Sequence, residues 1–298
     1  MKLALPSLKT VTREFLFTQE DFEQIRKLIY EHAGINLSEA KKDLVYSRLG
    51  RRLRANKLKR FSDYVALLDS KQNTEWEAFI NALTTNLTSF FREAHHFPIL
   101  AAHINSIKHR HNTNNPVKIW CNAASSGEEP YTIAITMMDL FGSLTPPVRI
   151  IATDIDTNAI EKAKNGVYTL EQAEKLPKDI LQRFFLKGRG EKTGRIKVRK
   201  ELSDLIEFKQ LNLYDEKWPV QGPFDAIFCR NVMIYFDKPT QNKILQRFAP
   251  VLHKDGLLFA GHSESLQGLT DMFKLQGKTV YCLSEKYLSR AINLTSKK

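Results

Sequence analysis

The sequence is short of cysteine and has no long apolar run, and each shortage excludes a class of protein. Its three cysteines, Cys121, Cys229 and Cys282, are far apart, odd in number and mostly inside strand-like runs, which is not the framework of a disulfide-rich secreted domain. No apolar stretch approaches membrane-spanning length, and the start MKLALPSLKT, broken by Pro6, lacks the continuous apolar segment of a signal peptide. We therefore expect a cytoplasmic protein with reduced cysteines.

Acidic residues are also outnumbered, by 33 to 45, and the resulting net charge of +12 would favour nucleic acid, an anionic membrane surface or acidic protein partners. The basic residues are concentrated in two clusters. The first comprises Lys41, Lys42, Arg48, Arg51, Arg52, Arg54, Lys57, Lys59 and Arg60, with the single acid Asp43. The second comprises Lys187, Arg189, Lys192, Arg195, Lys197, Arg199 and Lys200, with Glu191. Either cluster can also be read as an ordinary solvated face.

The chain is long enough for one large or two modest domains, and its 42% hydrophobic content supports a packed core. Residues 18–84 predict several short helices. Thr18 precedes an acidic first turn, and Ser38 is expected to start a longer helix. In that helix Leu44, Val45, Leu49 and Leu53 form the inner stripe, and Arg48, Arg51, Arg52 and Lys59 lie largely on other faces.

The run from Val117 to Asp156 predicts a strand, a tight loop, a helix and a second strand. VKIWC is apolar and β-prone, GEEPYTIAITMMDLF opens with the acids and proline that suit a first helical turn, and VRIIATD ends at Asp154. This order is typical of the first half of a nucleotide-binding α/β sheet, in which the acid binds ribose hydroxyls. We therefore expect a cofactor that contains adenosine.

Glycine is scarce where a dinucleotide site would need it. The loop after the first strand contains Gly127 only, whereas close approach to a pyrophosphate requires several glycines. The loop therefore argues against NAD and suits a cofactor without phosphates, such as S-adenosylmethionine.

The remaining segments continue the alternation of strands and helices. After Asp154 we expect a helix with Asn158 and Glu161 as a capping box. IEFKQLNL, FDAIFCRNV, DGLLFAGHSE and KTVYCLSE are strand candidates, and KPTQNKILQRFAPVL is a helix. The glycine-containing segment RGEKTGRIKVRKEL predicts a small antiparallel hairpin inserted between larger elements.

Together these patterns predict an α/β chain with a doubly wound, Rossmann-like domain, a small all-helical N-terminal domain and an inserted antiparallel β-hairpin subdomain. We expect a helical domain over residues 1–84 and a linker over 85–115 that contributes to the cofactor site. The cofactor-binding α/β domain would span 116–298, with the insert at about 186–204.

Five segments, TNLTSFFRE, SSGEEPY, ATDID, LNL and RNVMIYF, resemble in order and spacing the chemoreceptor glutamate O-methyltransferases of bacterial chemotaxis, the CheR family. The resemblance covers roughly residues 18–284. It implies S-adenosylmethionine-dependent methylation of glutamate side chains on chemoreceptors, with methyl esters and S-adenosylhomocysteine as products. One departure is Ala123, where many members have glycine, so the cofactor loop is expected to be slightly less open.

The resemblance also implies a set of cofactor-binding residues. They are Asn86, Thr88, Arg92, Glu129, Asp154, Asn212, Leu213, Arg230 and Asn231.

Most of these residues have a plainer interpretation that the sequence leaves open. Asp154 can cap the following helix, and Glu129 can be a first-turn acid favoured by the helix dipole. Asn212 and Asn231 can be turn formers at strand ends, and Arg92 a surface ion-pair partner. Asn86 and Thr88 can be ordinary polar linker residues.

The chemistry that the resemblance implies needs no general base. A glutamate side chain, with an unperturbed pKa of about 4.3, is already ionised at neutral pH. Catalysis should then come from alignment and from removal of water around the nucleophile. We expect Arg92 to bind the acceptor carboxylate. Tyr235 would donate a hydrogen bond or pack against the transferred methyl group, although it can also be a core aromatic.

The eight histidines do not predict a metal site. His95 and His96 are adjacent, and His109 and His111 alternate, but no cysteine or carboxylate spacing completes a ligand set. Displacement of a methyl group by a carboxylate needs no metal, so we expect none.

The resemblance gives both basic clusters an acidic protein partner. We expect the helix around Lys41–Arg60 to dock on the glutamate-bearing methylation helices of chemoreceptors. The insert around Arg189–Arg199 would bind a receptor's C-terminal tether peptide by strand addition. We expect no nucleic acid partner and no membrane insertion.

Two other functions fit part of the sequence. An RNA or DNA methyltransferase would fit the charge, but amino-group methylation usually involves an Asp/Asn-Pro-Pro-aromatic turn, and Arg230, Asn231, Val232 and Met233 occupy that place. A non-catalytic receptor-binding adaptor would not need Arg92, Asp154, Asn231 and Tyr235 together.

Overall fold

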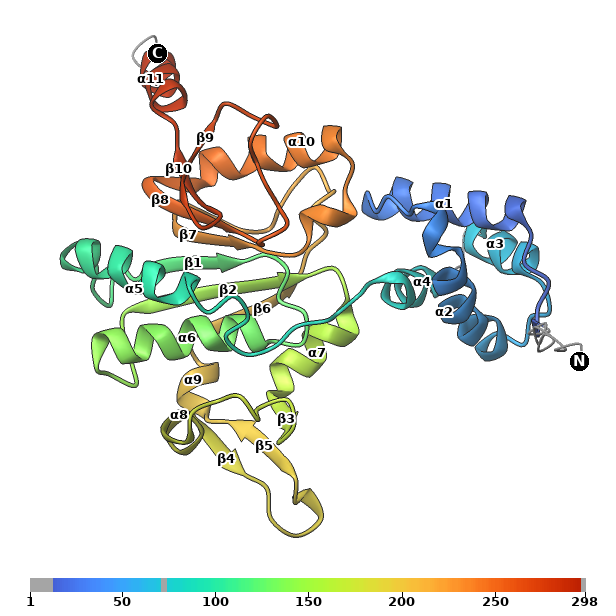
Figure 1. Ribbon diagram of the computed structural model, residues 1–298, viewed down its shortest axis with the longest axis horizontal. Coiled ribbons are helices and arrows are strands. Elements are labelled where there is room, and N and C mark those ends of the chain that lie inside the picture. The colour runs from blue at the N-terminus through green and yellow to red at the C-terminus, as the bar shows by residue number, and fades with distance from the viewer. Residues whose placement is uncertain (1–12, 71–73, 296–298) are drawn as a thin grey trace, which may run out of the picture.

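The computed structural model describes residues 13–70 and 74–295. A helical N-terminal domain lies beside a large α/β sheet, and a smaller sheet projects below the large sheet in the view of Figure 1. This arrangement confirms the predicted fold class: a doubly wound α/β domain, an all-helical N-terminal domain and an antiparallel insert.

The N-terminal domain is a group of short helices around its own apolar core. Its elements are α1 (Gln19–Ala33), the 3₁₀ turn η1 (Glu39–Lys41), α2 (Lys42–Ala55), α3 (Phe61–Asp69) and α4 (Glu75–Leu83). Thr18 caps α1 in a reciprocal capping box with Asp21, as its acidic first turn indicates. The helix expected to start at Ser38 begins with η1 and becomes α-helical only at Lys42.

Seven strands form the large sheet in the order β6-β2-β1-β7-β8-β10-β9. They are β1 (Val117–Cys121), β2 (Val148–Asp154), β6 (Ile206–Gln210), β7 (Phe224–Cys229), β8 (Leu252–Ala260), β9 (Phe273–Gly277) and β10 (Val280–Leu283). The first five strands in this order pair in parallel, and β10 is antiparallel to both neighbours. The strand order reverses on either side of β1, which is where α/β sheets bind ligands.

Helices cover both faces of this sheet. One apolar core includes residues of α5 (His96–Ile107) and α6 (Glu128–Phe141), and the core on the other face includes residues of α10 (Lys238–Phe248). The remaining elements are η2 (Lys108–Arg110), α7 (Thr157–Asn165), η4 (Met233–Tyr235), η5 (Ala249–Val251) and α11 (Glu285–Thr295). Segment 85–115, which we expected to be a linker, therefore contains helix α5. Among the described residues, none of the helices has the length and apolar character to span a bilayer.

The insert is a three-stranded antiparallel sheet with the order β3-β5-β4. The hairpin found in the sequence corresponds to β4 (Phe185–Lys187) and β5 (Arg195–Val198), and η3 (Gly190–Lys192) forms its turn. Helices α8 (Lys178–Phe184) and α9 (Lys200–Ser203) flank it. The third strand, β3 (Val167–Thr169), was not predicted, because three residues are too few to show a pattern of alternation.

The expected capping box of α7 is wrong. Asp156 is the N-cap, and its Oδ1 accepts a hydrogen bond from the Ala159 N–H at 3.1 Å. Asn158 lies inside the first turn and is exposed. The helix starts immediately after the second strand, so the acid that follows that strand takes the capping position.

The two large domains meet through specific polar contacts. Asn36 N–H donates to the Tyr235 carbonyl at 2.8 Å, and the Tyr30 hydroxyl donates to Asp237 at 2.8 Å. Gly34 ends α1 with φ of 68°, and a Cβ there would lie 2.5 Å from the ring of Tyr214. A residue with a side chain would therefore have to displace the Tyr214 ring at this contact between the domains.

Candidate functional site

A cavity of about 380 Å³ opens at the carboxyl edge of the parallel strands, between the sheet and the helical domain. Every site residue predicted from the sequence lines it: Asn86, Thr88, Arg92, Glu129, Asp154, Asn212, Leu213, Arg230, Asn231 and Tyr235. The volume lies in the range of small-molecule sites. Residues far apart in the sequence are thus gathered around one space, although no ligand contact tests their individual roles.

Asp154, at the end of β2, is the buried acid of this cavity. One carboxylate oxygen accepts from the Ser125 N–H at 2.7 Å and the other from the Asp156 N–H at 3.0 Å. Burial raises its pKa to about 6, although these backbone bonds oppose the rise. Because Asp156 caps α7, the interpretation of Asp154 as a helix cap is excluded. Each oxygen keeps a lone pair for a further donor, which suits ribose hydroxyls.

The loop under the cavity depends on Gly127. This residue has φ of 99°, and a Cβ there would lie 2.8 Å from the Tyr168 hydroxyl and 2.9 Å from Ala163 Cβ. The single glycine of the loop is therefore needed for close packing against α7 and the insert. Ser125 also adopts a positive φ, 49°, which turns its N–H toward Asp154.

Asn86 belongs to the segment that crosses from α4 to the sheet, and it is held on both sides. Its amide donates to Asp156 at 2.6 Å, and the Thr84 hydroxyl donates to the same carboxylate oxygen at 2.7 Å. The Ser125 hydroxyl donates to the Asn86 carbonyl at 3.3 Å. Asn86 therefore ties this segment to the loops of the cofactor cavity, and it is more than an ordinary polar linker residue.

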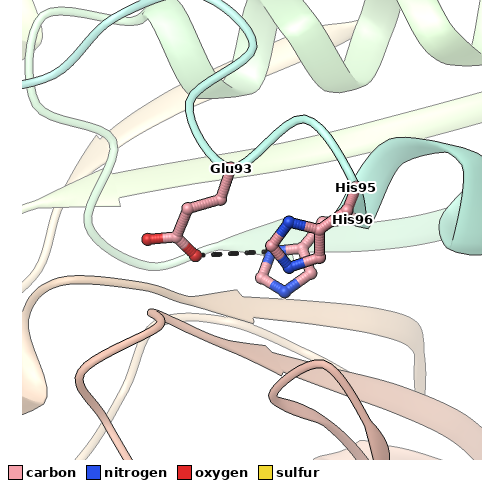
Figure 2. A group of neighbouring side chains, drawn as sticks. All are labelled: Glu93, His95 and His96. Carbon is pink, nitrogen blue, oxygen red and sulfur yellow. Dashed lines mark ion pairs between the residues drawn. The ribbon is translucent and has the colours of Figure 1, made fainter.

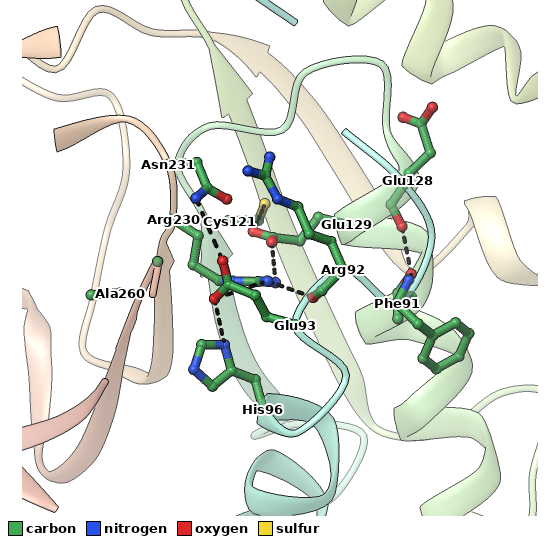
Figure 3. A network of polar contacts seen from close by, with 12 residues as sticks. Phe91, Arg92, Glu93, His96, Cys121, Glu128, Glu129, Arg230, Asn231 and Ala260 are labelled. Carbon is green, nitrogen blue, oxygen red and sulfur yellow. Dashed lines mark hydrogen bonds and ion pairs between the residues drawn. The ribbon is translucent and has the colours of Figure 1, made fainter. Parts of the chain in front are cut away.

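Glu129 and Arg230, both predicted to bind the cofactor, are paired with each other beneath the cavity (Figure 3). Arg230 Nη1 donates to Glu129 Oε2 at 2.5 Å, and Arg230 Nη2 lies 3.4 Å from Glu93 Oε2. All three side chains are largely buried. Burial raises the pKa of Glu129 despite the nearby Arg230. At Glu93 burial acts in the same direction, but Arg230 and His262 outweigh it and lower the pKa.

Asn231 follows β7 in the left-handed conformation, with φ of 58°. Its N–H donates to Glu264 Oε2 at 2.7 Å, and the Gly261 N–H donates to the same oxygen at 2.7 Å. The carboxylate of Glu264 is buried and fixes the turn at the end of β7. Asn231 is thus both a turn former and a cavity residue, since asparagine tolerates this backbone geometry.

Asn212 and Leu213 line the cavity after β6, but the Asn212 side chain is already engaged. Its amide donates to the His32 carbonyl at 2.8 Å and to Asp215 at 2.9 Å, and its oxygen accepts from the Tyr214 N–H at 3.0 Å. The turn-forming interpretation therefore accounts for this side chain.

Arg92 and Tyr235, the two predicted catalytic residues, are both half-buried and both line the cavity. Arg92 Nη1 donates to the Leu87 carbonyl at 2.8 Å, which uses one of five guanidinium donors. Tyr235 is the last residue of η4, the turn that follows the loop after β7, and its carbonyl accepts the bond from Asn36. The interpretation of Tyr235 as a core aromatic is weakened by its position on the cavity wall.

One group of described residues has the composition of a cation site: Glu93, His95 and His96, whose ligand atoms lie within 4.8 Å of one another (Figure 2). His96 Nε2 lies 2.9 Å from the Lys278 carbonyl, and burial lowers the pKa of His96 to about 4. The guanidinium of Arg230 already stands beside Glu93. A divalent cation here would be repelled by that charge, so we assign no metal to this group.

The helical domain also contributes to the cavity, which the sequence did not indicate. The lining residues from its helices and their connections are Ala33, Ile35, Asn36, Leu37, Ser38, Lys41, Leu44 and Leu83. Asn122, the first polar residue after β1, was another missed lining residue, and its position after a buried strand was the available signal.

The first basic cluster is only partly free to meet a partner. Arg52 forms two hydrogen bonds with Glu75, at 2.7 and 2.8 Å, and Arg48 bonds to the Leu83 carbonyl at 2.9 Å. Arg51 is exposed on α2. Lys59 is also exposed, but the expectation that it belongs to this helix is wrong, because α2 ends at Ala55. The outer face of α2 is therefore basic, but two of the arginines expected there hold the domain together.

Comparisons with known proteins agree with this architecture. Residues 20–84 match the family description "CheR methyltransferase, all-alpha domain", and residues 86–282 match "CheR methyltransferase, SAM binding domain". A chemotaxis protein methyltransferase of Salmonella typhimurium is 50% identical over 291 residues, covering 96% of this chain and 99% of the relative. Chemotaxis protein methyltransferase 2 of Pseudomonas aeruginosa is 49% identical, covering 94% and 99%. A chemotaxis protein methyltransferase of Escherichia coli is 49% identical, covering 93% and 96%.

Proposed function

The chain belongs to the CheR methyltransferase family, and we propose that it transfers the methyl group of S-adenosylmethionine to glutamate side chains of bacterial chemoreceptors. Family membership makes it an S-adenosylmethionine-dependent methyltransferase of chemotaxis. The glutamate acceptor, the roles of single residues and a cytoplasmic location are the parts that we propose. The division into a helical domain ending near residue 84, a connecting segment and a catalytic domain belongs to the same proposal.

The observation that carries the proposal is the convergence of the predicted site residues on one cavity between the two domains. Asp154 offers the ribose hydroxyls a buried carboxylate, and the loop after β1 lines the cavity with the small residues Ala123 and Ser125. The residues therefore fit an adenosine cofactor that has no pyrophosphate. In this site Asn86 and Thr88 would border the cofactor on the side of the connecting segment.

The bound cofactor supplies an electrophilic methyl group on a sulfonium. A glutamate oxygen provides the electron pair of the new O–CH₃ bond, and the electrons of the broken S–CH₃ bond stay on sulfur as a neutral thioether. Because the carboxylate is ionised at neutral pH, the protein needs to align it and exclude water rather than remove a proton.

We propose that two residues lining the cavity do this. The guanidinium of Arg92 has further donors beyond its bond to Leu87, and we assign it to the acceptor carboxylate. The Tyr235 hydroxyl is assigned to the region of the transferred methyl. Arg230 stays paired with Glu129 beneath the cavity and serves to hold the floor in place.

The partner surface that we propose is the exposed basic face of α2. Arg51 is exposed there, and Lys59 is exposed in the segment that follows the helix. Arg52 is bound to Glu75, so a charge reversal at Arg52 would also damage the domain. The matched test compares Arg51→Glu with Lys108→Glu, an exposed lysine in η2 before β1, at the opposite edge of the sheet. Slower receptor methylation in Arg51→Glu alone, with unchanged cofactor affinity, would support docking.

The second proposed contact is a receptor tether peptide on the insert. Because β5 is the central strand, β3 and β4 leave their outer edges available for strand addition. Exposed cations Arg195 and Lys197 would attract an acidic peptide to the same sheet. Peptide titration into the Arg195→Glu, Lys197→Glu variant should show weaker binding than the unaltered protein, and undiminished affinity would contradict this contact.

The experiment that tests the proposed function is transfer of labelled methyl groups. The purified protein is incubated with methyl-labelled S-adenosylmethionine and membranes rich in chemoreceptors, with a receptor lacking its acceptor glutamates as the control. Base-labile label on the receptor, released as methanol, would establish a carboxyl methyl ester. Label that resists base, or transfer only to nucleic acid, would refute the glutamate assignment.

A further inference from the structure

Two large apolar side chains are exposed at the opening of the cavity. Leu87 is 80% exposed and Ile234 is 53% exposed, yet both line the cavity, which places them at its rim. Six other large apolar side chains of the described residues are comparably exposed, and none of those six lines the cavity. A pair of exposed apolar groups beside a functional cavity is a feature of interaction sites rather than of an average surface.

The backbone under both side chains is held in place. Arg92 donates to the Leu87 carbonyl at 2.8 Å. The Ile234 N–H points to Glu264 Oε1 at 3.4 Å, and that buried carboxylate also accepts from two other N–H groups at the end of β7. The two side chains are therefore presented to solvent by ordered segments, from the connecting segment on one side and from η4 on the other.

Two cations line the same cavity as this apolar pair. Lys41, which is exposed, and Arg92, which is half-buried, line the same cavity. The rim therefore combines positive charge, suited to an acidic group, with apolar surface, suited to what flanks that group. A free carboxylate ligand alone would use the cations and leave both apolar side chains in water.

We infer that Leu87 and Ile234 form a specificity-determining apolar rim that packs against the receptor helix on either side of the acceptor glutamate. The inference rests on the proposed function. It commits the partner to a helical surface on which the glutamate is flanked by apolar side chains. It also assigns acceptor recognition to this rim and cofactor binding to the residues deeper in the cavity.

The rim should act on the acceptor KM and leave cofactor affinity unchanged. Replacing either side chain by serine removes apolar area that would be buried in the complex but exposes no new surface in the free protein. We expect KM for the receptor to rise about tenfold in each of Leu87→Ser and Ile234→Ser, which corresponds to about 1.4 kcal/mol. The conservative variants Leu87→Met and Ile234→Val should restore most of the affinity.

The test measures initial rates of methyl transfer to a purified receptor cytoplasmic fragment at saturating S-adenosylmethionine, and Kd for S-adenosylhomocysteine by calorimetry. Leu144→Ser is the matched control, because Leu144 is also 53% exposed but lies between α6 and β2, at the opposite edge of the sheet. The supporting result is a raised receptor KM in the two rim variants only, with kcat and the Kd within twofold of the unaltered protein.

Three results would overturn the inference. An unchanged receptor KM in both rim variants would refute it directly. A weakened Kd for S-adenosylhomocysteine would assign the two side chains to the cofactor instead. If the unaltered protein formed no base-labile ester on the fragment, the proposed function itself would fail, and the inference would fall with it.

Discussion

Arg48 connects the proposed receptor-facing helix to the cofactor cavity, and its removal gives a sharp prediction. Its guanidinium bonds to the Leu83 carbonyl at 2.9 Å, the Thr84 carbonyl at 2.6 Å and the Thr85 hydroxyl at 3.1 Å. These three positions immediately precede Asn86, which lines the cavity. Arg48→Ala should therefore loosen the segment that borders the cofactor without removing any group from the cavity itself.

The magnitude follows from the number and exposure of these bonds. A hydrogen bond to a charged group contributes about 1.5–3 kcal/mol when fully buried, but Arg48 is only half-buried, so solvent screens the loss. We expect the free energy of unfolding to fall by about 2 kcal/mol, and the Kd for S-adenosylhomocysteine to rise about tenfold, or about 1.4 kcal/mol. For Arg48→Lys, both the free energy of unfolding and the Kd should lie between those of the unaltered protein and Arg48→Ala, because an ammonium group cannot reproduce the planar set of guanidinium donors.

The measurements are urea unfolding and calorimetric titration with S-adenosylhomocysteine. Arg51→Ala is the matched control, since Arg51 lies on the same helix with its side chain exposed. Equal cofactor affinity in Arg48→Ala and Arg51→Ala, with both proteins folded, would refute the proposed coupling between α2 and the cavity.

Three further predictions concern the cavity itself. Burial raises the pKa of Asp154 to about 6, so affinity for S-adenosylhomocysteine should be constant above pH 7 and weaken as the pH falls through 6, where a proton occupies an acceptor oxygen. Calorimetric titration from pH 5 to 8 checks this. The Asp154→Asn variant should lose the pH dependence. Arg230→Met should lower the free energy of unfolding by about 3–5 kcal/mol in urea, because Glu93 and Glu129 lose their buried partner; a loss under 1 kcal/mol would contradict this. Gly127→Ala should cost about 2–4 kcal/mol by the same measurement, because a Cβ would lie 2.8 Å and 2.9 Å from its neighbours at a φ of 99°. Unaltered unfolding of that variant would show that the loop can relax.

Local patterns predicted the parts of the fold that depend on near neighbours in sequence. The apolar runs of β1 and β2 and the acid at the end of the second were legible because buried parallel strands need continuous apolar residues. The strand β3 and the N-cap of α7 were not predicted, each for its own reason. β3 is three residues long and exists only because β5 pairs with it, and the cap depended on where the preceding strand ends.

The resemblance of five segments to the CheR family implied the set of residues that would surround a cofactor. The sequence by itself determined the class of fold and the absence of a pyrophosphate-type loop. These follow from residue type and spacing, which act over a few positions. Only the tertiary structure decided which partners the side chains of those residues bind. It paired Arg230 with Glu129, engaged Asn212 in a turn and placed Arg48 on the connecting segment. Hydrogen bonds and burial between segments remote in the chain set these partners, and no local pattern records them.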